Sequence, residues 1–281
     1  MSIKKYLSKI PSFEGKKIII TGATSGIGLE LARHLLSKDA ELVLLARNLS
    51  KADSVKEEFL KEFPNGKISI VQYDQSDREL IDSAINEIKA NHGDFYAIVA
   101  NAGILYPKKG ELSKQGYPLT IDTNYLGLRY FLDKVIPLFN NKRYVMMGSM
   151  MANYRVPKNP DIYSDKYSLF KQYNMSKGCV EALWHHYQEN NGTNEFILAE
   201  PGVVSTGIFR GFNWLFRVVG GFLVKLVCHS AKKAALTLLL SLTTTSKNGN
   251  YIVPRGLLTI SGYPKYKKFP KNRKREYLIN Q

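Results

Sequence analysis

The chain has 281 residues, of which 44% are hydrophobic and 23% are charged. These values are close to the average for folded globular proteins, so they exclude a disordered or fibrous chain and fit one large domain or two small ones. The 40 Lys and Arg residues outnumber the 24 Asp and Glu residues and give a net charge of +16. This excess predicts an anionic partner, such as a phosphate-bearing cofactor, a membrane surface or a nucleic acid.

The predicted elements alternate between short apolar runs, typical of buried strands, and longer amphipathic runs, typical of helices. The expected strands are residues 17–20, 41–46, 67–73, 95–100, 143–147, 195–199 and 251–254. The expected helices are a segment that ends near residue 36, then 51–63, 78–90, 119–139, 173–189 and 231–243. Strands that are apolar throughout are buried on both faces, which indicates a parallel sheet. The alternation predicts an α/β protein, with either a doubly wound sheet or a barrel.

A glycine-rich loop between the first strand and the first helix decides between these folds. It consists of Thr21, Gly22, Ala23, Thr24, Ser25, Gly26, Ile27 and Gly28. Its first glycine allows a tight turn, its second lets the backbone approach a pyrophosphate, and its third lets the helix pack closely on the sheet. The N–H groups at the helix start would face the phosphates. Many strand-to-helix turns use glycine, but this setting favours a dinucleotide site and a Rossmann-type doubly wound sheet.

The end of the second strand predicts which dinucleotide binds. An acidic residue there would hold a ribose 2′-hydroxyl, whereas a basic residue suits a 2′-phosphate. The strand ends without an acid and continues into Arg47 and Asn48. The guanidinium of Arg47 can donate two parallel hydrogen bonds to a phosphate, and Ser25, Asn48 and Lys51 could add donors. A solvated surface arginine is the alternative, but the pattern favours NADP over NAD.

Tyr173 and Lys177 lie four residues apart in the predicted helix 173–189 and therefore share one face. A free tyrosine has a pKa near 10 and is a poor base at neutral pH. A neighbouring ammonium stabilises tyrosinate and lowers its pKa, so Tyr173 could exchange a proton with a substrate hydroxyl or carbonyl. Ser149, which follows the fifth strand, could hold the substrate oxygen by a hydrogen bond. An ordinary exposed helical pair is the alternative for Tyr173 and Lys177 taken alone.

These residues stand in the order found in the short-chain dehydrogenase/reductase family, which the chain resembles over about residues 17–208. The features that carry the resemblance are the glycine loop, Asp74, Asn101-Ala102-Gly103, Asn124, Ser149, Tyr173 with Lys177, Pro201-Gly202 and Thr206. The gap between Ser149 and Tyr173 is longer than is common in the family. An insertion at 152–172 causes it and is similar to the arrangement in the retinol-dehydrogenase-like branch, where the insertion flanks the substrate pocket.

The resemblance implies roles for these residues. Lys177 would also bind the nicotinamide ribose, and Asn124 would anchor a water that relays protons to Lys177. Cofactor contacts are implied for both motif residues and several loops: Gly22, Thr24, Ser25, Gly26, Ile27, Gly28, Arg47, Asn48, Asp74, Gln75, Asn101, Ala102, Gly103, Tyr173, Lys177, Pro201, Gly202, Val204 and Thr206. NADP(H) would carry the hydride, while the protein supplies alignment and acid–base chemistry.

Two segments near the C-terminus depart from the regular alternation. Residues 207–228 are apolar, rich in aromatic side chains and interspersed with basic ones, and lie where the family places its substrate lid. They could cover a lipophilic substrate, lie in a membrane interface or pack on the protein's own core. Residues 262–281 hold seven basic side chains and one acidic, and we expect an extended basic tail remote from the chemistry. We therefore predict one domain over residues 1–261, with the lid at 207–228, followed by the tail at 262–281.

Other features bound the setting of the protein. Two cysteines, Cys179 and Cys228, are too few for a disulfide framework and lack metal-ligand spacing, so we expect reduced thiols and no metal. The N-terminal residues lack the apolar run of a signal peptide, and no uncharged apolar run reaches the roughly 18 residues of a spanning helix. We expect a cytoplasmic protein that could touch membranes peripherally through the lid and tail. Copies could pair through helices equivalent to 119–139 and 173–189, by analogy with the fold.

The leading hypothesis is an NADP(H)-dependent oxidoreductase that interconverts the alcohol and carbonyl of a lipophilic substrate. Retinoids, steroids, fatty aldehydes and sphingoid ketones are the candidate classes, which would place the protein in lipid metabolism. A non-catalytic, NADP-sensing interaction protein is the alternative. A nucleic-acid binder is not expected, because base-stacking and groove-reading motifs are absent from the sequence.

Overall fold

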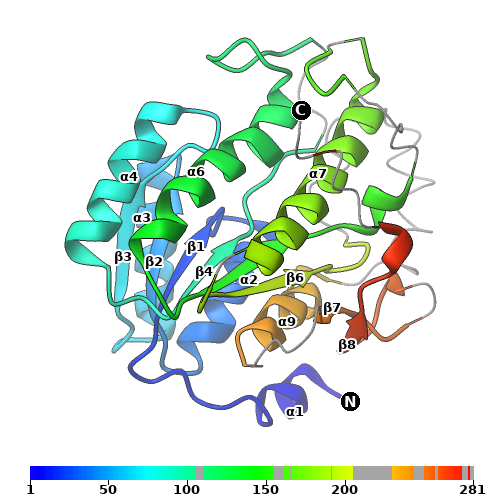
Figure 1. Cartoon of the computed structure of the whole chain (residues 1–281). Helices are drawn as coiled ribbons and strands as arrows, with labels where there is room; N and C mark the ends of the chain where they lie inside the picture. Colours follow the sequence, from blue (N-terminus) through cyan, green and yellow to red (C-terminus); the bar gives the residue numbers. More distant parts are fainter. Residues whose placement is uncertain are drawn as a thin grey trace, which may run out of the picture.

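A computed structural model describes residues 1–105, 110–154, 161–164, 166–190, 192–204, 230–243, 250–256, 259–273 and 278. Within this part of the chain, the centre is a sheet of eight strands in the order β3-β2-β1-β4-β5-β6-β7-β8 (Figure 1). The strands are β1 Lys17–Thr21, β2 Glu41–Ala46, β3 Ile68–Gln72, β4 Ala97–Ala100, β5 Arg143–Met147, β6 Glu195–Ala199, β7 Asn250–Pro254 and β8 Pro264–Lys268. Strands β1 to β7 pair in parallel, and β8 is antiparallel to β7.

Helices cover both faces of this sheet (Figure 1). They are α1 Ile3–Leu7, α2 Gly26–Leu36, α3 Leu49–Glu62, α4 Arg78–Asn91, α5 Leu119–Ile121, α6 Gly127–Val135, α7 Leu169–Asn190 and α9 Ala231–Ser241. In β1, Ile18 and Ile20 pack with the side chains of α2, α3 and α9, whereas Ile19 packs with those of α4, α6 and α7. Because side chains alternate along a strand, an apolar strand supplies two cores at once. The predicted α/β Rossmann-type sheet is therefore confirmed.

The predicted helix over 119–139 is interrupted. After α5, a π turn, η1, runs over Asp122–Leu126; α6 and a 3₁₀ turn, η2 Ile136–Leu138, follow. The side chain of Asp122 pairs with Arg78, and Gly127 approaches so closely that an added Cβ would lie 1.6 Å from the carbonyl oxygen of Gln75. The helix thus departs from α-helical geometry where it contacts the loop between β3 and α4. Wider turns of this kind recur at functional sites, and this one contains Asn124.

The expectation of a tail remote from the domain, beginning at residue 262, was wrong for residues 264–273. Residues Pro264–Lys268 form β8, and a 3₁₀ turn, η6 Lys271–Arg273, follows it. Arg273 is buried and pairs with the carboxylates of Glu181 in α7 and Glu200, which follows β6. The tyrosine hydroxyl of Tyr251 in β7 accepts a hydrogen bond from Arg273 Nη1 at 3.4 Å. A basic residue in the predicted tail is therefore a structural part of the domain.

The predicted lid at 207–228 lies outside the described residues. Among the helices that the structure describes, none is both long enough and apolar enough to cross a bilayer.

Candidate active site and cofactor site

The residues singled out by the sequence gather at the carboxyl edge of the sheet. Strand order reverses between β1 and β4, because the chain proceeds outward from β1 in one direction and from β4 in the other. In open α/β sheets, ligands bind in the crevice at such a point, outside the carboxyl ends of the strands. The glycine loop follows β1, and Asn101-Ala102-Gly103 follows β4, so both segments border this crevice.

The glycine loop has the backbone geometry of a phosphate cradle. Gly22 and Gly26 adopt φ angles of +69° and +59°, which favour glycine over other residues. A Cβ on Gly28 would lie 2.4 Å from the carbonyl oxygen of Gly22 and 2.5 Å from Nδ2 of Asn101. Glycine is therefore required at position 28, because the start of α2 packs directly against Gly22 and the side chain of Asn101.

Thr21 and Asn101 fix this loop to the end of β4. The buried hydroxyl of Thr21 accepts hydrogen bonds from the backbone N–H groups of Asn101, at 3.0 Å, and Ala102, at 2.8 Å. In return, Nδ2 of Asn101 donates to the carbonyl oxygens of Thr21, at 2.8 Å, and Gly22, at 3.1 Å. The sequence placed Thr21 at the start of the glycine loop but predicted no role for its side chain. Its signal was a polar side chain at the end of an otherwise apolar strand.

The start of α2 fits a bound pyrophosphate. Its N-cap residue, Ser25, makes no side-chain hydrogen bond to the helix, whereas Asn48 caps α3 by accepting from the N–H of Lys51 at 2.8 Å. The first N–H groups of α2 are thus not met by a capping side chain and face the crevice with the positive end of the helix dipole. Thr24 and Ile27 complete the loop around this end. The cradle and the uncapped helix fit a dinucleotide.

The end of β2 places Arg47 beside Asp74, which follows β3. The side chain of Arg47 is 73% exposed, and its Nε lies 3.8 Å from Oδ2 of Asp74. The other oxygen of Asp74 accepts from the N–H of Ser76 at 2.9 Å and from its hydroxyl at 2.7 Å. Arg47 is therefore positioned by one weak contact and can turn toward an anion. Asn48, predicted as a donor to the cofactor, uses its oxygen to cap α3.

Gln75 has a structural role through its side chain. Its amide nitrogen, Nε2, donates to the carbonyl oxygen of Thr123 at 2.5 Å. Its Oε1 accepts from the hydroxyl of Tyr73 at 3.1 Å. The side chain is buried by these contacts. Gln75 thus ties the loop after β3 to the π turn that carries Asn124, and only its backbone remains for a cofactor.

Asn124 is held firmly within the π turn. Its Oδ1 accepts from the N–H of Ile104 at 2.8 Å, and its Nδ2 donates to the carbonyl oxygen of Ile104 at 3.0 Å and to Oγ of Ser176 at 3.1 Å. The hydroxyl of Ser176 donates to the carbonyl oxygen of Tyr173 at 2.8 Å. Asn124 therefore connects the loop after β4 to the turn of α7 that carries Tyr173. Ser176 is a second residue that the sequence did not reveal, because it occupies a position between Tyr173 and Lys177 at which the motif specifies no residue type.

Gly103 brings the cofactor loops and the α7 pair together. A Cβ on Gly103 would lie 3.2 Å from Oδ1 of Asn124 and 3.9 Å from Nζ of Lys177. Lys177 donates from Nζ to the carbonyl oxygen of Met147, the last residue of β5, at 3.0 Å. Ser149 lies two residues farther along, where its Oγ accepts from the N–H of Met151 at 3.2 Å and caps the 3₁₀ turn η3 Met150–Asn153. Its hydroxyl hydrogen is left for another acceptor.

Lys177 is buried, and its surroundings change its pKa. Burial lowers the pKa of Lys177 from 10.5 to about 8, while the negative charge of Glu181, one helical turn away, opposes this change. Desolvation penalises the ammonium form, so this lysine is held in the fold at a cost in stability. Tyr173 lies one helical turn before Lys177 in α7, as the spacing of the two residues predicted.

We expect Lys177→Met to stabilise the cofactor-free protein by about 2 kcal/mol at pH 7. Each pKa unit corresponds to about 1.4 kcal/mol, and loss of the hydrogen bond to Met147 takes back about 1 kcal/mol. Because the folded pKa of about 8 lies below the ordinary 10.5, the unfolded chain binds more protons between these values, and wild-type stability rises with pH across this interval. Urea unfolding at pH 7 and pH 10 measures both effects, with the exposed Lys61→Met as control. A destabilised variant at pH 7 would contradict the assignment.

The loop after β6 completes this edge of the sheet. Pro201 is buried, and Gly202 has a φ of +79°. The N–H of Val203 donates to the carbonyl oxygen of Ile260 at 2.8 Å, and Val204 is buried beside it. Thr206 lies outside the described residues. Among the described residues, no group of His, Cys, Asp and Glu could hold a metal ion.

Comparison with known proteins agrees with this geometry. A family model described as short chain dehydrogenase matches residues 16–213. A short-chain dehydrogenase/reductase of Phomopsis amygdali is 30% identical over 229 residues, which cover 74% of this chain and 68% of the relative. The short-chain dehydrogenase/reductase pkfC of Emericella nidulans is 27% identical over 267 residues, covering 86% of this chain and 84% of the relative.

Solved structures with lower identity share the fold. An uncharacterised protein from Mycobacterium paratuberculosis superposes with a TM-score of 0.74 at 20% identity, covering 98% of this chain and 92% of that protein. L-sorbose reductase from Gluconobacter frateurii, solved with NADPH and L-sorbose, superposes with a TM-score of 0.65 at 18% identity, covering 83% of this chain and 91% of that enzyme.

Proposed function

Because this chain belongs to the short-chain dehydrogenase/reductase family, it is an oxidoreductase of alcohol or carbonyl groups that uses a nicotinamide cofactor, and we propose that it uses NADP(H) on a lipophilic substrate. One observation carries the proposed mechanism. Gly103 of the cofactor edge lies against both Asn124 and Lys177, and Lys177 in turn contacts the end of β5, which leads to Ser149. The predicted chemical groups therefore adjoin the predicted cofactor cradle.

In the proposed mechanism, Ser149 donates its hydroxyl hydrogen to the substrate oxygen and holds it in place. Tyr173 gives a proton to that oxygen when a carbonyl is reduced and takes one when an alcohol is oxidised. Lys177, one turn along α7, stabilises tyrosinate through its ammonium charge and so lowers the pKa of the phenol. Asn124 positions the turn of α7 that carries Tyr173. The bound cofactor supplies or accepts the hydride.

The preference for NADP(H) rests on Arg47. Its guanidinium is exposed at the end of β2, where the adenosine ribose of a dinucleotide lies in this fold. No acidic side chain occupies the position that would accept from a 2′-hydroxyl, and Asp74 is already engaged by Ser76. A planar guanidinium matches the geometry of phosphate. The NADPH bound by the sorbose reductase that shares this fold is consistent with the proposal.

We expect Arg47→Gln to raise the KM for NADPH about tenfold and to leave the KM for NADH unchanged. A hydrogen bond to a charged group contributes about 1.5 kcal/mol, which corresponds to about this factor. Initial rates at varied NADPH and NADH measure both constants. Lys61→Gln, an exposed change at the far end of α3, is the matched control. An equal loss with both cofactors would mean that Arg47 does not read the 2′-phosphate.

The lipophilic substrate is supported by aromatic side chains that remain exposed in the segment between Ser149 and Tyr173. Tyr154, which follows η3, is 50% exposed, Tyr163 is 43% exposed, and Phe170 at the start of α7 is 39% exposed. Exposed large apolar side chains that are close together can mark a binding surface, and these three belong to one segment of the chain. The direct test follows NADPH absorbance with a panel of lipophilic ketones and aldehydes, with NADH in parallel. Consumption of NADH alone, or of neither cofactor, would contradict the proposal.

A further inference from the structure

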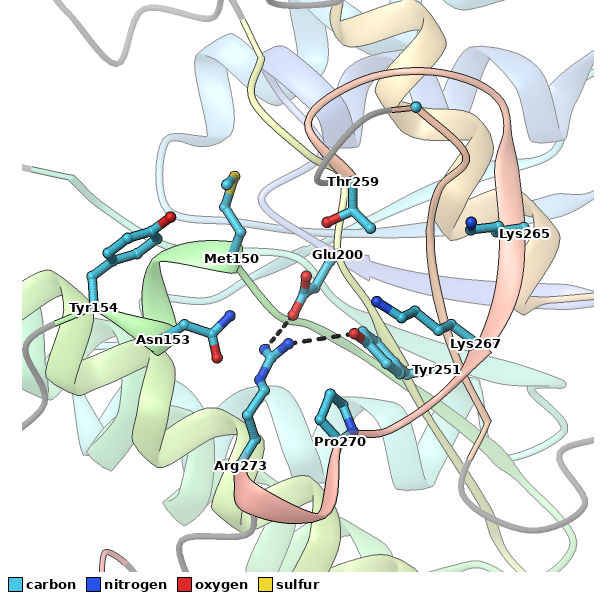
Figure 2. A pocket seen from close by; sticks show the side chains of 11 residues that line it. Met150, Asn153, Tyr154, Glu200, Tyr251, Thr259, Lys265, Lys267, Pro270 and Arg273 are labelled. Carbon is cyan, nitrogen blue, oxygen red and sulfur yellow. Dashed lines mark hydrogen bonds and ion pairs between the residues drawn. The ribbon is translucent and has the colours of Figure 1, made fainter.

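A polar pocket lies beside Ser149 and is not used by the proposed proton transfer. It has a volume of about 640 Å³ and is bounded by η3, the end of β6, β7, β8 and η6 (Figure 2). This volume is within the usual range for sites that bind small molecules. Met150 and Asn153 of η3 line it, and Met150 directly follows Ser149. The pocket therefore adjoins the residue that would hold the reacting oxygen.

Two lysines of β8 face this pocket. Lys265 and Lys267 both line it, and they lie two residues apart, so they share one face of the strand. The pairing of β7 with β8 places Lys267 opposite Tyr251, which also lines the pocket. Residues directly opposite in an antiparallel pair point to the same side. Figure 2 shows the ammonium group of Lys267 directed toward Glu200 and Tyr251.

The charge of this pocket is unbalanced. Among the described residues that line it, the one carboxylate is that of Glu200, which is paired with Arg273, whose Nη2 lies 2.5 Å from Oε1. Arg273 also pairs with Glu181, so the described residues of this buried cluster contribute one guanidinium and two carboxylates. Lys265 and Lys267 make no ion pair with any of the residues that the structure describes. Two ammonium groups thus border the pocket, and its lining carboxylate, Glu200, is already paired with Arg273.

We propose that Lys265 and Lys267 bind an anionic oxygen group of the substrate, a carboxylate or a phosphate monoester, at a distance from the reacting carbon. This inference rests on the proposed function, because it assigns the substrate class of the same site. The hydroxyls of Tyr154 and Thr259 and the amide of Asn153 also line the pocket and could add hydrogen bonds. The substrate is then amphipathic: an apolar body reaches Ser149, and an anionic end lies against β8.

The test uses matched substrates with the full chain. A series of methyl-ketone carboxylates of increasing length is compared with the methyl esters of the same acids and with the corresponding oxoalkyl phosphates. For the preferred anion, we expect the wild-type kcat/KM to exceed that of the ester. The double variant Lys265→Gln/Lys267→Gln should lower it about tenfold through KM, with kcat and the ester unaffected. Added salt should weaken only the anionic substrates.

Lys268→Gln is the matched control, because Lys268 is exposed on the same strand, does not line the pocket and points away by alternation. A second readout is calorimetric binding of the same acids and phosphates to protein saturated with NADP⁺. If nothing is reduced but the anions bind through Lys265 and Lys267, the proposed reaction fails and the anion site stands. If anions neither react nor bind better than esters, or if the double variant loses both equally, the anion site is overturned.

Discussion

Replacing Tyr173 by Phe will lower kcat by about a thousandfold, the contribution that a positioned acid or base makes to a proton transfer. The phenylalanine keeps the ring that is half-buried on α7 but cannot exchange a proton with a substrate oxygen. Asn124 donates to the hydroxyl of Ser176, and Ser176 donates to the backbone carbonyl of Tyr173. Neither bond uses the tyrosine hydroxyl, so both remain in place. The variant should therefore fold and bind the cofactor as the wild type does.

Two measurements separate chemistry from binding in this variant. Steady-state rates give kcat, and titration of NADPH fluorescence gives the dissociation constant of the cofactor. Tyr130→Phe is the matched control, because Tyr130 donates to Asp82 at 3.0 Å on the contact of α6 with α4, away from the site. A Tyr173→Phe enzyme with wild-type turnover would show that another group supplies the proton.

Replacing Arg273 by Met will destabilise the protein by about 3–5 kcal/mol, because it removes the guanidinium that pairs with two buried carboxylates. Glu181 and Glu200 are 1% and 2% exposed, and Arg273 contacts both. A methionine fills a similar space, so the loss comes from charge and hydrogen bonds more than from volume. Urea unfolding followed by circular dichroism measures the change.

Two further variants keep this result interpretable. Lys271→Met changes an exposed residue of the same 3₁₀ turn and should leave stability unchanged. The triple variant Arg273→Met/Glu181→Gln/Glu200→Gln removes the charges together and should recover most of the lost stability, since neutral replacements for a buried ion cluster are often tolerated. An Arg273→Met protein that unfolds at the wild-type urea concentration would show that the cluster contributes nothing.

The parts of the site that the sequence predicted are those set by local patterns. The glycine loop could be found because the backbone at Gly22 and Gly26 demands positive φ angles within a single strand–turn–helix unit. Tyr173 and Lys177 could be paired because helical spacing places residues four apart on one face. The strands could be found because a sheet covered on both faces requires side chains that are apolar throughout.

The parts that could not be predicted depend on contacts between distant segments. The π turn at Asn124 comes with a close approach of Gly127 to Gln75, a contact between distant segments that no local pattern around residues 119–139 signals. Arg273 bonds to Glu181 and Glu200, which lie 92 and 73 positions earlier, and its basic neighbours give the segment the composition of a solvated tail. The pocket at β8 was hidden for the same reason, because Lys265 and Lys267 belong to that segment.

The Arg273 cluster also bears on how the protein is made. A chain under synthesis that has emerged only as far as β7 already contains Glu181 and Glu200 but not their arginine, and β7 still has an unpaired edge. Bringing together charges 92 and 73 positions apart is a long-range step that must wait for the later segment. Until β8 and Arg273 are present, Glu181, one turn along α7 from Lys177, lacks the guanidinium with which it pairs in the folded protein. The charges around Lys177 can therefore reach their final arrangement only after residue 273 has been synthesised. Completion of the site is thus expected late in synthesis and folding of the chain.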